Sequence, residues 1–237
     1  MKILAKLSAF VLIIGFAASC SSGGGETTKT SEAKQVKESE FDMIYEIDKM
    51  ASSLKWEGYK PTGEHYGTVD ITSGELMVKD GKLVGGEFVI NLTSITVLDI
   101  EDPGMNDRLT GHLKSADFFE VENYPEAKFE ITEVTPVSGS PSDPSMEKGE
   151  IKPTHKVTGN LTMKGITKSI AFNANVDMSK GEFNALTNMF FLDRTEWDVK
   201  FKSKKIFANL KDDFINDEMG ISIKLIAKPK EKEMANL

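Results

Sequence analysis

The sequence predicts an all-β domain of about eight or nine antiparallel strands, arranged either as a sandwich or as a closed barrel. Apolar and polar residues alternate through most of the chain beyond residue 76, which gives strands with one buried face and one wet face. Turn signals such as Lys79-Asp80-Gly81-Lys82 separate these strands. Only the stretch 106–123 breaks the alternation, and it has the spacing of a short helical segment.

The chain begins with the three-part pattern of a secretory signal. Two lysines flank the start, residues 7–16 form an apolar run too short to span a bilayer comfortably, and small residues lead up to Cys20. Cys20 is the only cysteine, so it cannot form an internal disulfide. Its setting, Ala18-Ser19-Cys20, resembles a bacterial lipobox. We therefore expect residues 1–19 to be a lipoprotein signal peptide and Cys20 to carry the lipid anchor.

Composition divides the rest of the chain into three parts. Residues 20–40 are rich in Gly, Ser, Thr, Glu and Lys and predict a flexible tether. Residues 41–229 carry the alternating pattern and predict the folded domain, and residues 230–237 predict a polar tail. The formal net charge of the whole chain is −8. This acidic balance argues against a nucleic-acid partner, because nucleic acids attract clustered Lys and Arg.

Six segments carry the alternation most clearly. Each has apolar residues on one face and mainly polar residues on the other, as in a strand of an antiparallel sheet. The apolar members are Phe88, Ile90 and Leu92; Ala127, Phe129 and Ile131; Val157, Leu161 and Met163; Ile170, Phe172, Ala174, Val176 and Met178; Trp197, Val199 and Phe201; and Ile221, Ile223 and Leu225. The pattern alone does not decide whether these side chains fill the interior or surround a hollow one.

The segment Asn106–Asn123 is predicted to be a loop with one or two helical turns that covers one end of the domain. Phe118 and Phe119 lie near its end, and we expect one ring to plug the core while the other leans toward the mouth of the interior. Arg108 and His112 lie upstream, where they could meet a polar head group or a neighbouring carboxylate. A histidine with a satisfied hydrogen bond is the simpler interpretation of His112.

The sequence contains none of the motifs that mark a metal site or a catalytic centre. His65, His112 and His155 are scattered and lack ligand spacing. There is no G-x-S-x-G motif, and Cys20 lies outside the predicted domain. We therefore expect a protein that is not an enzyme and needs no metal or cofactor. A lesser alternative is an enzyme or metal protein that uses His65 and His112 together.

A set of short sequence blocks lies in order between Tyr45 and Ala227. The blocks are Ser53-x-Lys55-Trp56 with His65-x-Gly67; Asp80-Gly81-x-Leu83 with Gly86-x-Phe88-x-Ile90; Gly111-His112-Leu113-Lys114-Ser115-x-Asp117-Phe118-Phe119 with Tyr124-Pro125 and Phe129; Gly159-x-Leu161-Thr162-Met163-Lys164-Gly165; and Asp193-Arg194-Thr195-x-Trp197. Any one block is a weak signal, but their shared order is a strong one. Together they resemble the YceI-like family of lipid-binding proteins.

The resemblance implies an extended antiparallel eight-stranded barrel, similar to a lipocalin, with a short helical segment over one end. A barrel of that size is wide enough to hold one small ligand or to be filled by side chains. The residues expected to line its lumen are Trp56, Phe88, Ile90, Phe118, Phe119, Phe129, Leu161, Met163, Phe172, Trp197 and Val199. Those expected at a polar mouth are Arg108, His112 and Arg194.

In this interpretation the protein is a membrane-tethered binder of a polyisoprenoid, isoprenoid quinone or fatty-acyl lipid, used for transport, storage or sequestration. It is expected in the bacterial cell envelope, on the periplasmic side or at the outer membrane, as a monomer or a homodimer. Cys20 would supply the membrane contact. The alternative is a lipoprotein interaction module whose barrel is filled by its own side chains and binds an envelope protein partner.

Overall fold

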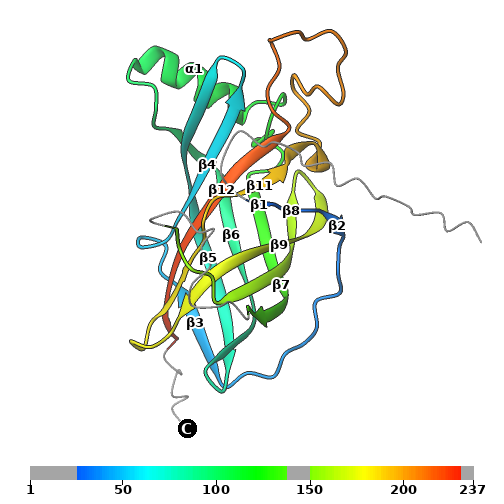
Figure 1. The fold of residues 1–237 in the computed structure, drawn as a ribbon. Helices are drawn as coiled ribbons and strands as arrows, with labels where there is room; N and C mark the ends of the chain where they lie inside the picture. Colours follow the sequence, from blue (N-terminus) through cyan, green and yellow to red (C-terminus); the bar gives the residue numbers. More distant parts are fainter. Residues whose placement is uncertain (1–25, 138–149, 231–237) are drawn as a thin grey trace, which may run out of the picture.

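The computed structural model describes residues 26–137 and 150–230, which are built mainly of strands around one interior (Figure 1). The strands are β1 (Glu26–Thr27), β2 (Ser31–Glu32), β3 (Met43–Ile47), β4 (Ser53–Lys60), β5 (Gly63–Lys79), β6 (Lys82–Val97), β7 (Glu126–Pro136), β8 (His155–Met163), β9 (Ile166–Asp177), β10 (Phe183–Leu186), β11 (Phe190–Asp193) and β12 (Glu218–Pro229). The helices are α1 (Pro103–Lys114) and the 3-10 helix η1 (Arg194–Trp197). Neither of these two helices, the ones found in the described part of the chain, is long and apolar enough to cross a bilayer.

The strands close into a ring with eight positions, which confirms the predicted barrel. β5 to β9 pair in sequence order, and β10 continues the ring from β9 to β12. β3 and β4 share the last position, because each pairs with both β5 and β12. These pairings are antiparallel, so the alternating pattern places one face of each strand in the interior.

The barrel has two unlike ends. One end, named the open end here, carries α1, the β4–β5 turn and the chain around η1 (Figure 1). The opposite end, named the closed end, carries the start of β3 and the β5–β6 turn (Figure 1). In that turn Asp80 and Gly81 have φ values of 51° and 69°, the left-handed values that an Asp-Gly hairpin requires. The sequence therefore predicted this turn correctly.

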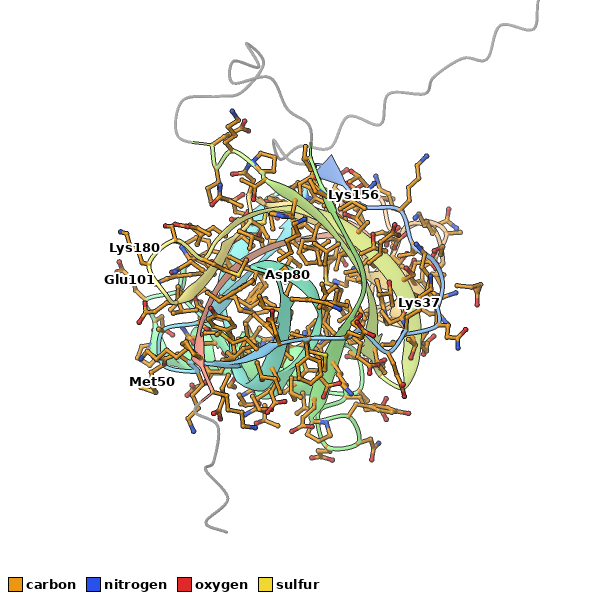
Figure 2. All side chains as sticks on the ribbon, turned by 90° about the horizontal axis from the view of Figure 1, so that it is seen from below. Lys37, Met50, Asp80, Glu101, Lys156 and Lys180 are labelled. Carbon is orange, nitrogen blue, oxygen red and sulfur yellow. The ribbon has the colours of Figure 1, made fainter. Side chains whose placement is uncertain are left out.

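The half of the barrel at the closed end is filled by its own side chains. Tyr45 and Phe183 meet there with ring centroids 6.1 Å apart. Leu76, Val78 and Leu225 pack in the same core and are 2–4% exposed. Figure 2, which views this end, shows the labelled lysines around the outside. Apolar side chains thus occupy the interior and charged ones the outer surface, as the period-two pattern predicts.

Helix α1 covers part of the open end and begins earlier than the sequence predicted. The expected helical turns lay within 106–123, whereas the helix starts at Pro103 and runs for 12 residues. Asp102 caps it, because its carboxylate accepts a first-turn backbone N–H at 2.8 Å. The side chain of Asn106 donates to two backbone carbonyls at and just beyond the end of β6, at 2.9 and 3.0 Å. Leu113 then buries its side chain against the barrel.

Residues 26–40 are not the free tether that their composition predicted, because β1 and β2 are bound to the barrel. β1 pairs in parallel with β11, and β2 pairs antiparallel with β9. Between them, the buried Thr28 donates its hydroxyl to the carbonyl of Ala171 at 3.0 Å and its N–H to that of Phe191 at 2.9 Å. The arm therefore bridges β9 and β11. Backbone hydrogen bonds to strand edges need no apolar side chains, so composition gave no sign of them.

The predicted strand through Trp197, Val199 and Phe201 is wrong. This segment contains the end of η1 followed by turns, although Trp197 and Val199 are both 0% exposed. Asp193 caps η1 by accepting the N–H of Thr195 at 3.0 Å. The chain then turns after Trp197 and presents Val199 to the interior again. Trp197 and Val199 are thus buried two positions apart, which is the same spacing that a strand produces. Residues 1–25, with Cys20 and the predicted signal peptide, and residues 231–237 lie outside the described ranges.

Candidate ligand cavity

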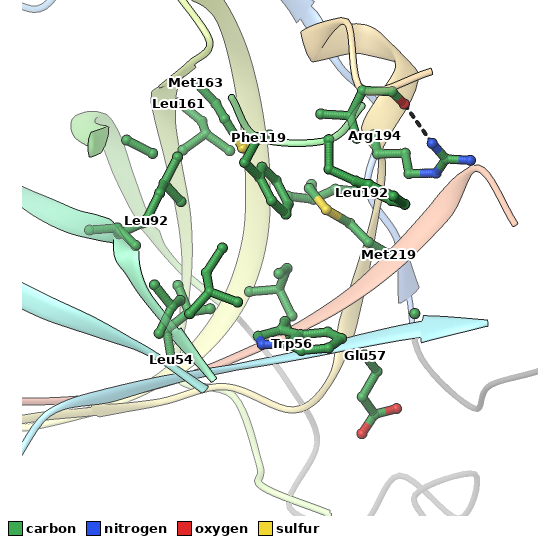
Figure 3. Close-up of a pocket in the computed structure, with 18 of the residues that line it drawn as sticks. Leu54, Trp56, Glu57, Leu92, Phe119, Leu161, Met163, Leu192, Arg194 and Met219 are labelled. Atoms are coloured by element: carbon green, nitrogen blue, oxygen red, sulfur yellow. Dashed lines mark hydrogen bonds between the residues drawn. The ribbon is translucent and has the colours of Figure 1, made fainter. Parts of the chain in front are cut away.

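A cavity occupies the half of the barrel at the open end (Figure 3). Inward side chains of β4 to β9, β11 and β12 form its wall, together with residues of α1 and of the chain around η1. Ten of the eleven predicted lumen residues lie in this wall: Trp56, Phe88, Ile90, Phe118, Phe119, Phe129, Leu161, Met163, Phe172 and Val199. Trp197 does not, because it is buried in η1 and donates its indole N–H to the carbonyl of Leu161 at 3.0 Å.

The cavity is narrow and almost entirely apolar. Its free volume is about 130 Å³. All of the space between protein atoms in this region, including solvent at the opening, amounts to about 1070 Å³. A dry cavity of about 150 Å³ holds one small aromatic ring. A longer ligand therefore enters by displacing lining side chains. Phe119 and Met219 are half-buried members of the wall (Figure 3), and the unbranched side chain of Met219 can readjust to a ligand.

A row of aromatic rings runs along the wall of the cavity. Phe88 and Phe129 have ring centroids 5.3 Å apart, Phe129 and Phe172 5.4 Å, and Phe172 and Phe190 4.8 Å with nearly parallel planes. The next inward residue of β7 toward the closed end, Ile131, is buried but does not line the cavity. The row thus lies where the hollow half of the barrel meets the filled half.

Trp56 forms one side of the open end. Its indole N–H donates to the carbonyl of Thr96 at 3.2 Å. The ring lies over Gly67, its partner on β5, where an added Cβ would come within 2.9 Å of the indole and 1.8 Å of the Thr96 oxygen. Glycine at this position therefore allows the indole to pack against the strand. Figure 3 shows Trp56 turned into the cavity while the neighbouring Glu57 points away.

Several further wall residues were absent from the predicted lumen set, among them Leu54, Leu113, Leu192, Ile215 and Met219. Leu54 and Met219 extend the period-two series that contain Trp56 and Ile221, so alternation could have found them. Ile215 lies in irregular chain before β12 and carries no periodic signal. The cavity therefore depends partly on a long loop whose position no local pattern specifies.

Arg194 reaches the cavity wall, but its guanidinium holds the backbone instead of offering itself to a ligand. It is 4% exposed. Nη1 donates to the carbonyl of Val199 at 2.7 Å (Figure 3), Nη2 to those of Phe201 and Ile215 at 2.9 and 3.1 Å, and Nε to that of Asn216 at 3.0 Å. These bonds fasten both ends of the loop between η1 and β12. The predicted role at a polar mouth is therefore corrected to a structural one.

The other two predicted mouth residues, unlike Arg194, lie outside the cavity wall. Arg108 is exposed on α1. His112 pairs its Nε2 with Asp117 at 2.9 Å and packs edge-on against Phe118 and Phe201, with ring centroids 5.0 and 4.7 Å away. It therefore joins α1 to the loop after η1, which is the structural interpretation that the sequence favoured.

His65 has a carboxylate partner of its own, separate from that of His112. Its Nδ1 lies 2.7 Å from Asp99 Oδ2. Burial raises the pKa of Asp99, but hydrogen bonds from His65 and from the Tyr66 N–H outweigh burial and hold that pKa below its usual value. Across the residues that the structure describes, no group of three or more His, Cys, Asp or Glu side chains could hold a metal ion.

We expect Asp193→Asn to reduce the acid sensitivity of folding. Burial raises the pKa of Asp193, but hydrogen bonds from Lys205 and Thr195 outweigh it and hold the pKa below the usual range. A carboxyl with a lowered folded-state pKa stabilises the fold above its unfolded pKa of about 3.9, and this contribution is lost as the pH falls through the folded-state value. Urea unfolding between neutral pH and pH 3 measures the effect.

The exposed Asp107→Asn on α1 is the matched control for this prediction. Asparagine at 193 keeps an oxygen to cap η1, so the fold should survive at neutral pH. The unfolding free energy of Asp193→Asn should then decline less on acidification than that of the control. Equal declines would show that Asp193 does not contribute to the pH dependence.

The sequence profile of the YceI-like domain matches residues 45–227, nearly all of the described barrel. Among curated proteins, the chain is 41% identical over 71 residues to a UPF0312 protein of Photorhabdus laumondii and 43% identical over 63 residues to one of Pseudomonas putida. These stretches cover 30% and 27% of this chain. The chain spans less than a third of each relative, 29% and 26% respectively.

Solved structures share the fold at low sequence identity. Burkholderia cenocepacia BcnA aligns with a TM-score of 0.57 at 19% identity, over 77% of this chain and 99% of that one. A polyisoprenoid binding domain from Saccharophagus degradans aligns with a TM-score of 0.55 at 17% identity, over 80% of this chain and all of that one. These likenesses establish the fold. The profile match across residues 45–227 shows that the chain belongs to the YceI-like domain family.

Proposed function

We propose that this protein binds one long-chain apolar lipid in the cavity at the open end and holds it for transport, storage or sequestration. The cavity itself is the observation that carries the proposal, because almost all of the surface that its wall presents to the interior is apolar. Each methylene removed from water contributes about 0.8 kcal/mol, so a tail of about ten buried carbons would contribute about 8 kcal/mol. The narrow free volume favours a slender polyisoprenoid, isoprenoid quinone tail or acyl chain over a bulky ring system.

The half-filled interior favours lipid binding over the alternative of an interaction module with a self-filled barrel. A self-filled barrel would carry large side chains along its whole length, as the closed end does. The open half instead contains a cavity whose wall includes small residues such as Gly58 and Ala127. A binding role without catalysis is part of the proposal, since a passive apolar tunnel needs few polar groups.

Intrinsic fluorescence offers a direct test, because the chain has two tryptophans, Trp56 and Trp197. Trp56 lines the cavity, whereas Trp197 lies behind the wall. Titration with a polyprenyl alcohol or a fatty amide should change the emission of the wild-type protein in a saturable way. Trp56→Phe should lose most of that change while the emission of Trp197 stays. An unchanged response in Trp56→Phe, or no saturable response in the wild type, would refute binding in this cavity.

The proposal includes a membrane tether at Cys20, which lies outside the described residues. We expect Cys20→Ser to move the protein from the membrane fraction to the soluble fraction, because multiple acyl chains on one cysteine anchor a protein stably. Cell fractionation followed by immunoblotting measures this. Ser22→Ala, two residues away, should stay with the membrane. Retention of Cys20→Ser at the wild-type level would exclude lipidation as the anchor.

A further inference from the structure

The loop after η1 carries a local charge opposite to that of the whole chain. Residues 200–211, named the lysine loop here, contain five lysines and no acidic residue, in a chain of net charge −8. The lysines are Lys200, Lys202, Lys204, Lys205 and Lys211. In their midst the neighbouring apolar side chains of Ile206 and Phe207 are each 47% exposed. Exposed apolar residues flanked by lysines are typical of segments that bind the surface of a bilayer.

The lysine loop lies at the open end and is joined to the cavity wall. It follows η1, and the chain returns to β12 through Ile215 and Asn216, both in that wall. The buried Arg194 donates to the carbonyl of Phe201, near the start of the loop, and to that of Ile215, which follows the loop. Figure 1 shows this loop, in orange, projecting from the same end as α1. A surface that bound the loop would therefore lie beside the opening of the cavity.

The charges of the lysine loop remain accessible to a partner. Lys200, Lys202 and Lys205 pair with Asp198, Asp213 and Asp193, but their side chains stay 47%, 34% and 60% exposed. Lys204 lies over the ring of Phe214, with its Nζ 3.3 Å from the centroid. Neither Lys204 nor Lys211 pairs with a carboxylate in the described part of the chain. Such lysines attract the anionic head groups of a membrane at about 1 kcal/mol each near its surface.

Two further observations favour a bilayer as the occupant of this surface. Leu98 and Met105, at the α1 side of the open end, are 58% and 66% exposed, so apolar side chains project on both sides of the opening. The chain also limits how far the barrel can stand from an anchor at Cys20. Since β1 begins at Glu26 beside β11, five residues separate the anchor from the barrel wall, a reach of at most about 20 Å.

We propose that the lysine loop docks the open end of the barrel onto a bilayer with anionic head groups, with Ile206 and Phe207 inserted at the boundary between head groups and acyl chains. The cavity opening then faces the membrane, and an apolar tail passes between the bilayer and the cavity with little exposure to water. This inference rests on the proposed lipid-binding function.

Site-specific fluorescence tests the docking in the full chain. Cys20→Ser removes the sole cysteine, so Ile206→Cys or Met50→Cys then provides a single site for an environment-sensitive label. Met50 is the matched control, because it is 88% exposed in the turn between β3 and β4. Each labelled protein is mixed with vesicles of phosphatidylcholine or of equal parts phosphatidylcholine and phosphatidylglycerol, with and without a lipid-borne quencher.

The label at position 206 should shift to shorter wavelength and be quenched on the anionic vesicles, whereas the label at position 50 should not. Lys204→Glu with Lys211→Glu should weaken this binding by about tenfold or more. Equal insertion into neutral vesicles, or no insertion, would overturn the proposal. So would burial of the label without vesicles, which would point to a second copy of the chain. The Trp56 response to added lipid is measured on the same labelled proteins without the lysine substitutions. If that response occurs while the label at position 206 does not insert, only the docking proposal is wrong and lipid binding in the cavity stands.

Discussion

Replacing Gly58 with leucine is expected to weaken lipid binding by at least about tenfold while leaving the barrel folded. Gly58 lines the open end of the cavity two residues after Trp56 on β4, so it faces inward. A Cβ added there would meet no atom within 4 Å. The leucine side chain would thus project into the narrow opening without strain and compete with the lipid tail. Titration monitored by Trp56 fluorescence, or by native mass spectrometry, measures the loss.

Gly111→Leu is the matched control for this substitution. Gly111 is exposed on α1, and a Cβ there also meets nothing within 4 Å, but the residue does not line the cavity. The Gly111→Leu variant should bind lipid as tightly as the wild type does. Thermal unfolding of both variants shows whether each is folded. If Gly58→Leu is folded and binds as tightly as Gly111→Leu, the opening beside Trp56 is not used by the ligand.

Arg194→Met is expected to lower the free energy of unfolding by about 3–5 kcal/mol, the range for removing one member of a buried charged group. Methionine fills similar space but donates no hydrogen bond, so four backbone carbonyls lose their donor. The carboxylate of Asp217, whose side chain is 11% exposed and 3.6 Å from Arg194, would lose its cation. The expected fall in Tm is about 6–20 °C.

Two variants make the Arg194 prediction specific. Arg108→Met changes the chain's other arginine, which is exposed on α1, and should shift stability by less than about 0.5 kcal/mol. Arg194→Lys keeps the charge but replaces the planar fork with a single ammonium, so it should fall between the wild type and Arg194→Met. If Arg194→Met and Arg108→Met unfold alike, the loop between η1 and β12 does not depend on the guanidinium.

Alternation predicted the strands that form the regular part of the barrel because each has one wet face. β7 with Phe129, β9 with Phe172 and β12 with Ile223 follow it closely, and their inward residues are those expected. The N-terminal arm escaped prediction because its contacts are hydrogen bonds from the backbone and from a hydroxyl, as at Thr28, and need no apolar side chains. The segment at Trp197 was wrongly predicted as a strand, because a capped 3-10 turn can also bury two residues that lie two positions apart.

Alternation could not predict whether the barrel was hollow, because inward-facing residues are apolar in a hollow barrel and in a filled one. The difference depends on which side chains meet across the interior. Tyr45 and Phe183 come from distant parts of the chain and fill the closed end together. Near the open end, small residues such as Gly58 and Ala127 face inward and leave the space unfilled. Strand register determines which side chains contact one another across the interior, and no local sequence pattern encodes that register.

The most direct test of the lipid-binding proposal is a native mass spectrum of the protein after gentle purification from its own host. Lipid binding in the cavity predicts a population with one bound apolar molecule per chain, released on denaturation and strongly reduced in Gly58→Leu. Identification of the released molecule would name the ligand. A spectrum with only the bare protein mass, together with no adduct after adding polyprenyl alcohols, quinones or fatty-acyl lipids, would contradict the proposal.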